Sequence, residues 1–336
     1  MNPNLLRFLT PLYGGSISLR NLLYDSGIKQ ARAVDLPVLS VGNLTVGGTG
    51  KTPVVIALAQ ELARRGWHPA ILSRGYGRTS RGTIQLSTGS GTPSQSWQDV
   101  GDEPYLMALS CPDIPVVVDE DRVRGARYIQ THLEADLVIL DDAFQHRRLH
   151  RDCDIVLLSA GDSRDRYRLL PGGRLREPLS SLRRAHVIFL TKTNLFPVPP
   201  EIRRFLASVQ KPAFQLEVLT ESPRPLETSR RFTPGKSALL VSGIGDPASF
   251  EQTVRSLSIE IREHLLFRDH RAYTDADVRR IETAFHRSGA DYILTTEKDA
   301  VRLQRKVGAS LPVAVLPIRV PLPAEAVDTI QGLLAH

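Results

Sequence analysis

The 336-residue sequence has little cysteine, few aromatic residues and no long apolar run. Its two cysteines, Cys111 and Cys153, are too few for a disulfide framework or a four-cysteine zinc site, so we expect two small buried residues in a reducing compartment. Aromatic residues make up 6%, and no signature of a nucleic-acid-binding module is present, which argues against a nucleic-acid partner. No stretch reaches the roughly 18 consecutive apolar residues of a membrane span, and we expect no secretory signal.

The composition otherwise fits a soluble globular protein, with 41% hydrophobic and 24% charged residues. The length predicts one large domain or two moderate ones. The net charge of +7 favours acidic partners, such as phosphate-bearing ligands or an anionic membrane surface. The sequence leaves the oligomeric state open.

Leucines recur at near-helical spacing at the start of the chain, with Arg7 and Arg20 among the polar positions. The pattern is typical of a helix that lies on a membrane surface, and equally of a helix packed on the protein core. We expect Pro11 and the glycines that follow it to interrupt either helix. The leucines that form the pattern are Leu5, Leu9, Leu12, Leu19 and Leu23.

Short apolar runs then alternate with helix-length segments, which is typical of βαβ units. We therefore expect an α/β fold, a P-loop NTPase-like, mainly parallel sheet flanked by helices, with a second, smaller α/β domain. Proline and charge between 223 and 236 predict a linker. The expected parts are an amphipathic segment at 1–30, a P-loop domain at 31–222, this linker, and a smaller domain at 237–336. The runs in the larger domain are 37–41, 70–73, 83–87, 116–118, 137–140, 155–158 and 187–190.

The segment that follows the run at 37–41 predicts a phosphate-binding loop before a helix. Its glycines allow backbone conformations barred to other residues and bring N–H groups close to phosphate oxygens. Lys51 would place a cation on the β- and γ-phosphates, and the Thr52 hydroxyl is a Mg²⁺ ligand in such loops. The first position of the usual motif is glycine, but here it is threonine. The expected nucleotide-binding residues are Thr45, Val46, Gly47, Gly48, Thr49, Gly50, Lys51 and Thr52.

Carboxylates follow the apolar runs at several points. Asp141 and Asp142 come directly after the run at 137–140, where a P-loop protein holds its metal shell, so we expect at least one of them to act on Mg²⁺. Asp102 and Glu103 precede a helix, where they could cap it or serve as a general base and a metal ligand. A histidine such as His270 is more often structural, and spacing alone leaves its role open.

Three glycine- or arginine-rich segments, at 73–78, 144–148 and 170–178, suit phosphate recognition, although ordinary loop chemistry explains each equally well. Together with the other motifs they resemble one family. Segments 41–53, 73–77, 101–104, 141–149, 171–178 and 296–300 look, in this order, like those of tetraacyldisaccharide 4′-kinase, the lipid A 4′-kinase of Gram-negative bacteria.

This resemblance implies an ATP- and Mg²⁺-dependent kinase that phosphorylates the 4′-hydroxyl of an acylated glucosamine disaccharide 1-phosphate lipid, giving lipid IVA. It implies a peripheral enzyme on the cytoplasmic face of the inner membrane, which makes the N-terminal segment a membrane-contacting helix. It implies a site in the cleft between two α/β domains. The residues implied are Asp102 as base, His270 as its partner, Lys51 and Arg174 at phosphate, and Thr52, Glu103, Asp141 and Asp142 at the metal and nucleotide.

Two other functions remain in view. A regulatory or partitioning P-loop ATPase usually carries a lysine before the first glycine of its loop, where this chain has Val46. The other is a soluble small-molecule kinase, in which the N-terminal leucines would have no role except packing against the protein core.

Overall fold

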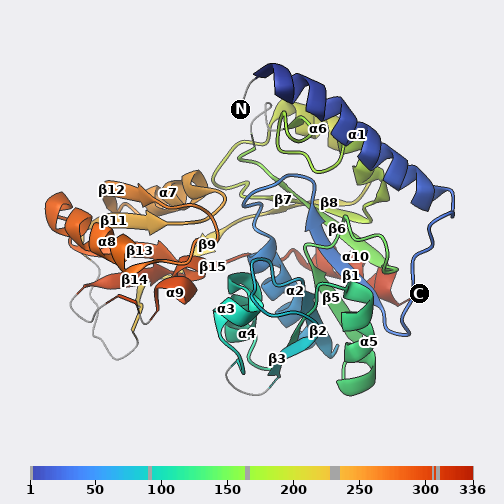
Figure 1. The fold of residues 1–336 in the computed structure, drawn as a ribbon, viewed down its shortest axis with the longest axis horizontal. Helices are drawn as coiled ribbons and strands as arrows, with labels where there is room; N and C mark the ends of the chain where they lie inside the picture. The colour runs from blue at the N-terminus through green and yellow to red at the C-terminus, as the bar shows by residue number, and fades with distance from the viewer. Residues whose placement is uncertain are drawn as a thin grey trace.

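In a computed structural model, the structure describes residues 3–89, 93–162, 167–227, 235–304, 306–307 and 311–335. The side chains of residues 1–8 and part of the expected linker, 228–234, lie outside what is described. The apolar runs form two sheets of two α/β domains, and a long N-terminal helix lies along the outside of the larger one (Figure 1). The expected fold class is confirmed.

The larger sheet has eight strands in the order β3-β4-β2-β5-β1-β6-β7-β8, and only β3 runs antiparallel to its neighbour. The phosphate loop follows β1, and Asp141 closes β5 beside it, in register with Val41. Both lie at the carboxyl edge of the sheet, where α/β proteins bind ligands. The strands are β1 Val38–Asn43, β2 Pro69–Ser73, β3 Ile84–Thr88, β4 Pro115–Val118, β5 Leu137–Asp141, β6 Cys153–Ser159, β7 Val187–Thr191 and β8 Ala213–Leu216.

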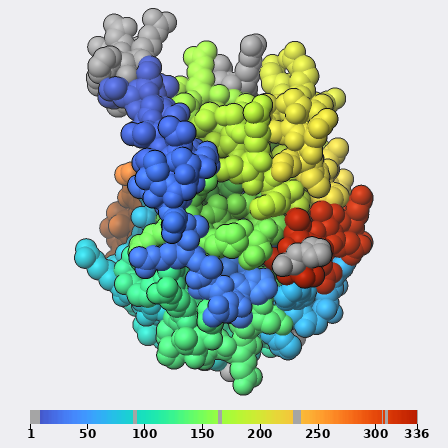
Figure 2. All heavy atoms as spheres, turned by 90° about the vertical axis from the view of Figure 1, so that its right-hand side faces the viewer, coloured from blue at the N-terminus to red at the C-terminus, as the bar shows by residue number. Residues whose placement is uncertain are grey.

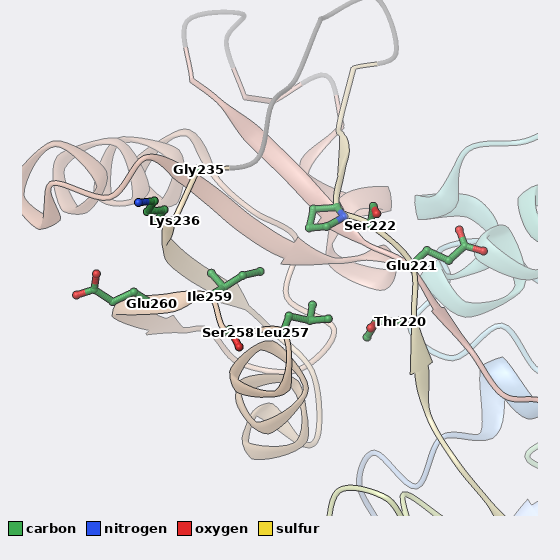
Figure 3. Close-up of a pocket in the computed structure, with 10 residues that line it drawn as sticks. Thr220, Glu221, Ser222, Gly235, Lys236, Leu257, Ser258, Ile259 and Glu260 are labelled. Carbon is green, nitrogen blue, oxygen red and sulfur yellow. The ribbon is translucent and has the colours of Figure 1, made fainter.

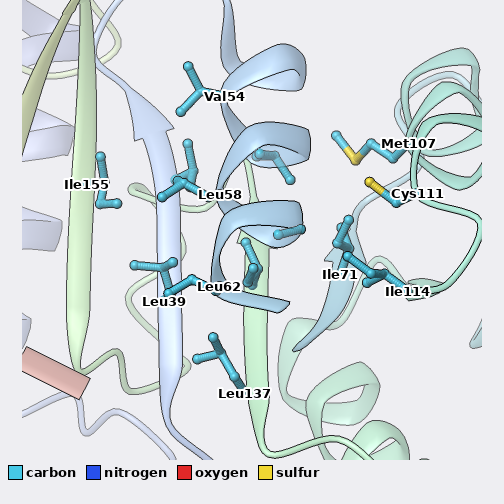
Figure 4. Packing of buried hydrophobic residues seen from close by; sticks show 14 of the residues in the cluster. Leu39, Val54, Leu58, Leu62, Ile71, Met107, Cys111, Ile114, Leu137 and Ile155 are labelled. Atoms are coloured by element: carbon cyan, nitrogen blue, oxygen red, sulfur yellow. The ribbon is translucent and has the colours of Figure 1, made fainter. Parts of the chain in front are cut away.

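Helices cover both faces of this sheet because its central strands are buried along their whole length. In Figure 4, Val54, Leu58 and Leu62 of α2 point onto the sheet, and Cys111 packs near them beside Met107. Both cysteines are free and buried, as expected, and burial raises the pKa of each thiol to about 12. The helices are α2 Lys51–Arg64, α3 Trp97–Val100, α4 Asp102–Ser110, α5 Arg122–His132, α6 Pro200–Val209 and the 3₁₀ helix Leu179–Arg184.

The smaller sheet has five strands in the order β10-β14-β13-β11-β12, and only β10 is antiparallel. The chain enters this domain through β9 and leaves it through β15, and these two strands pair as a two-stranded ribbon. The elements are β9 Leu219–Thr220, β10 Arg224–Pro225, β11 Ser237–Ser242, α7 Pro247–Ser256, β12 Glu260–Leu266, α8 Asp275–Ser288, β13 Tyr292–Thr296, α9 Glu297–Leu303, β14 Val313–Leu316 and β15 Ile318–Arg319.

The C-terminal helix α10, Ala324–Leu334, differs from the expected domain division, which assigned all of 237–336 to the smaller domain. Its apolar side, which includes Val327 and Ile330, joins the core cluster of α2 and the large sheet. The reason is that an amphipathic helix must bury its apolar stripe, and the smaller domain is already covered by α7, α8 and α9.

The N-terminal helix α1, Pro3–Asp25, continues through Pro11 and the two glycines, so the expected interruption is wrong. Contacts along its length hold the helix against the larger domain: Tyr13 donates a hydrogen bond to the carbonyl of Arg176, and Arg20 pairs with Glu177. These tertiary contacts outweigh the hydrogen bond that a proline removes from a helix interior.

Candidate active site

The phosphate loop is already folded as a phosphate cradle. Gly47 has φ 122° and Gly50 has φ 85°, conformations that favour glycine and turn the backbone toward the start of α2. The buried Asn43 side chain supports the loop, because it donates hydrogen bonds to the Thr45 carbonyl at 2.6 Å and to the Thr49 hydroxyl at 2.8 Å. The loop therefore presents its N–H groups at a helix N-terminus, which is a site for phosphate.

The two aspartates after β5 have opposite electrostatic surroundings. Burial, together with the Glu103 and Asp142 carboxylates, raises the pKa of Asp141 well above its usual range. Its Oδ2 accepts a hydrogen bond from Ser73 at 2.9 Å, while its buried Oδ1 has no partner among the described residues. Burial also acts on Asp142, but Lys51 and Arg176 outweigh it and lower the pKa of that carboxyl.

Asp142 is tied to both phosphate-binding segments. Its Oδ1 lies 3.5 Å from the Lys51 ammonium, and Arg176 approaches both carboxylate oxygens at 2.9 Å. The neighbouring Arg174 lies against the phosphate loop, since a Cβ added to Gly47 would come within 3.1 Å of its Nη1. The loop at 170–178 thus brings two guanidinium groups beside the phosphate loop, where they could bind phosphate oxygens.

Asp102 and His270 come from different domains and meet where the two domains are in contact. Asp102 begins α4 and is 4% exposed, and its Oδ1 lies 3.0 Å from Nδ1 of His270. His270 has φ 57° and its ring packs against that of Tyr76, with centroids 4.9 Å apart. The structure therefore brings together two residues that the sequence left in separate segments.

Two more cations of the smaller domain face this pair, and sequence reasoning missed both. Lys298 contacts Glu103 and His270, while the fully buried Arg302 places Nε 3.5 Å from the second oxygen of Asp102. Burial raises the pKa of Asp102, but the His270 hydrogen bond and the charges of Lys298 and Arg302 outweigh it, so the pKa is lowered. The only sequence signal was that segment 296–300 belongs to the family motifs.

Burial and neighbouring charges also oppose each other at Lys298. Burial lowers the pKa of its ammonium, but the carboxylates of Glu103, Asp102 and Asp269 outweigh this effect and hold the pKa above its ordinary value. At neutral pH the group is therefore charged. Three carboxylates and two cations surround His270 where the domains are in contact, an arrangement suited to holding and moving a proton.

The phosphate loop also touches the smaller domain directly. Lys192, which follows β7, donates to the Gly48 carbonyl and to Asp246, both at 2.5 Å, and to Ser249 at 2.9 Å. Gly245 lies so close that an added Cβ would stand 2.9 Å from the Gly48 nitrogen. Sequence reasoning missed Lys192, although a lysine directly after a buried strand at this sheet edge was a usable signal.

A cavity of about 620 Å³ lies elsewhere, between the chain after β9 and the turn from α7 to β12. In Figure 3, Glu221 and Ser222 stand on one side of it, and Leu257 and Ser258 on the other. None of the phosphate-loop or cleft residues lines it. Among the described residues, no group of three or more histidine, cysteine, aspartate or glutamate side chains is placed to hold a metal ion alone.

A family model described as tetraacyldisaccharide-1-P 4′-kinase matches residues 3–335. A relative named tetraacyldisaccharide 4′-kinase from Bdellovibrio bacteriovorus is 38% identical over 306 residues, 89% of each chain. One of the same name from Aquifex aeolicus is 39% identical over 298 residues, 87% of each. A crystal structure of LpxK from Aquifex aeolicus in complex with ATP superimposes with a TM-score of 0.77 and 35% identity, covering 99% of this chain and 100% of that one.

Proposed function

The chain belongs to the tetraacyldisaccharide-1-P 4′-kinase family, and from this premise we propose that it transfers the γ-phosphoryl group of ATP to the 4′-hydroxyl of a tetraacyldisaccharide 1-phosphate, giving lipid IVA in lipid A biosynthesis. The observation that carries the proposal is the meeting of Asp102 and His270 next to a preformed phosphate loop. A switch ATPase would use such a base to activate water, whereas a kinase would use it on the acceptor hydroxyl, and the family to which the chain belongs favours the kinase.

The phosphates of ATP would bind to the backbone N–H groups of the loop from Thr45 to Thr52. Lys51 and Arg174 would meet the charge that develops on the transferred group, which is the main task in phosphoryl transfer. Asp102 would accept the proton of the acceptor hydroxyl. Its ionised state is favoured by the lowered pKa, and its buried Oδ2 has no hydrogen-bond partner among the described residues.

The residues present suit Mg²⁺. The unpartnered Oδ1 of Asp141 and the raised pKa of this carboxyl indicate negative charge that lacks a cation. Mg²⁺ commonly uses one or two carboxylates together with nucleotide phosphates, so a larger protein cage is not required. The ion would be held by Asp141, Asp142, Glu103 and the Thr52 hydroxyl. When bound, it would neutralise phosphate charge.

The outer side of α1 supports contact with a lipid surface. Leu12, Leu19 and Leu22 are 57%, 58% and 61% exposed, while Arg20 turns inward to Glu177. Charge faces the protein and leucine faces outward, the reverse of an ordinary surface helix. Figure 2 shows α1 lying on the surface of the larger domain. Between residues 11 and 24 the exposed residues are all uncharged: Pro11, Leu12, Gly15, Ser16, Ser18, Leu19 and Leu22. Asp25, at the end of the helix, is exposed and pairs with Arg147.

In the described part of the chain, no helix combines the length and apolarity that crossing a bilayer requires. We propose that the protein binds peripherally at the cytoplasmic face of the inner membrane, where α1 would rest among the headgroups. Replacing Leu12, Leu19 and Leu22 with serine should abolish sedimentation with anionic liposomes. The matched control replaces three leucines exposed to 45–53% elsewhere, namely Leu109, Leu219 and Leu266. Equal binding by both triple variants would contradict the membrane role of α1.

The activity is tested by transfer of label from γ-³²P-ATP to purified tetraacyldisaccharide 1-phosphate. We expect labelled lipid with the wild type and a loss of about 10²-fold or more in Lys51→Ala and Asp102→Ala, the range in which single charge-stabilising or basic groups contribute. Hydrolysis of ATP by folded, liposome-bound protein without any labelled lipid would overturn the proposal and favour a switch ATPase.

A further inference from the structure

Lys298 is a cation beside His270 to which the proposed reaction has so far given no role. It lies on α9 of the smaller domain, and its side chain is 16% exposed. Its ammonium lies 3.1 Å from Oε1 of Glu103, 3.3 Å from Nε2 of His270 and 3.4 Å from Oδ1 of Asp269. The group therefore touches the imidazole on the side opposite Asp102.

The chemistry of these contacts fixes where the imidazole proton resides. An ammonium has three donors and no acceptor, so Nε2 of His270 must supply the lone pair. The proton of the neutral ring is then on Nδ1, which donates to Oδ1 of Asp102 at 3.0 Å. A protonated Nε2 would point an N–H bond at a positive charge 3.3 Å away, which is electrostatically unfavourable.

The surroundings contain one competitor. Asp269 could accept a hydrogen from Nε2, which would favour the opposite tautomer, but its Oδ1 lies 3.8 Å from Nε2, beyond hydrogen-bond distance. Lys298 contacts both groups and so takes the place that this hydrogen bond would need. The other groups that face His270 are Asp102 and the ring of Tyr76.

We propose that Lys298 is a positioning residue that holds His270 as the neutral Nδ1–H tautomer. His270 then serves as a hydrogen-bond donor that orients Asp102, and Asp102 remains the carboxylate that receives the hydroxyl proton. Lys298 and His270 belong to the smaller domain and Asp102 to the larger one, so this alignment exists only while the domains are in contact. The inference rests on the proposed function only for the identity of the acceptor.

The tautomer is measured directly by long-range ¹H–¹⁵N NMR of protein labelled at histidine, with His270 assigned by its loss in His270→Gln. We expect an Nδ1–H ring in the wild type and in Lys298→Arg, because arginine is also a donor without an acceptor. Lys298→Met should shift the ring toward the Nε2–H or the doubly protonated form. Lys306→Met is the control, since that lysine is exposed and contacts Asp275. An Nε2–H ring in the wild type, or an unchanged ring in Lys298→Met, would overturn the proposal.

Kinetics distinguish a role through His270 from a direct one. Lys298→Met should lower kcat by about tenfold or more, but by less than the 10²–10⁴-fold that a general base supplies, and Lys298→Arg should restore most of it. In a His270→Gln background the same change should cost nothing further, because the partner is gone. Additive losses would overturn the proposal by assigning Lys298 directly to phosphate. If no variant, wild type included, phosphorylates the lipid, the proposed function fails while the NMR result still decides the tautomer.

Discussion

The contact between the phosphate loop and the smaller domain includes a buried ion pair, which makes a sharp prediction possible. The side chains of Lys192 and Asp246 are 7% and 10% exposed, and their charged atoms lie 2.5 Å apart. Lys192→Met would leave the Asp246 carboxylate buried with only Ser249 as a partner, at 2.5 Å from its hydroxyl. The Gly48 carbonyl would lose its donor as well.

The expected cost follows from what remains after the change. Removing one member of a buried ion pair typically costs about 3–5 kcal/mol, because the other charge stays uncompensated. The Ser249 bonds retain part of the solvation of Asp246, so we expect the lower part of that range. In the double variant Lys192→Met/Asp246→Asn, no buried charge is left unpaired. Its loss in free energy of unfolding should therefore fall to about 1–2 kcal/mol, the scale of one or two neutral hydrogen bonds.

The assay is urea unfolding of Lys192→Met, Asp246→Asn, the double variant and the wild type at fixed temperature, with ATP affinity measured alongside. ATP binding should weaken in both lysine variants because the Gly48 peptide is no longer held. Exposed Lys306→Met serves as the control for loss of a lysine. The reasoning is refuted if Lys192→Met costs less than about 1 kcal/mol, or if the double variant loses the sum of the two single losses.

Two further predictions concern buried groups. Glu177 is fully buried and pairs with Arg20 of α1 at 2.6 Å and with Arg184 at 2.9 Å. Glu177→Leu should therefore release α1 from the larger domain and speed its proteolysis. An unchanged cleavage rate would show that other contacts hold α1. Burial, reinforced by nearby arginines, lowers the pKa of His146 from 6.5 to about 4. Its neutral form therefore stabilises the fold fully above pH 6.5, and this contribution, on the order of 3 kcal/mol, is lost as pH falls toward 4. Measured by unfolding, His146→Asn should flatten that slope, whereas the same change at exposed His150 should not.

The elements that sequence patterns predicted well are those whose character is local. The helix predicted after the phosphate loop is α2, Lys51–Arg64, because the loop's glycines and the start of the helix are written in adjacent residues. Strands β8 and β12 carried no clear pattern because both are half-exposed sheet edges; β8 is only four residues long, and β12 is rich in charged residues. The path of α1 through Pro11 depended on distant partners, which no local pattern contains.

By itself, the sequence determined the phosphate loop, the acidic pair after β5 and the two-domain α/β fold, since each follows from residue types within a few positions of one another. The tertiary structure decided which side chains meet. Asp102 and His270 are 168 positions apart, and Lys298 reaches Glu103 across 195. A histidine, a lysine and a buried arginine acquire a common role only when two sheets bring them to one cleft. The charge that each of them carries there is set by desolvation and by neighbours, which composition and spacing do not encode.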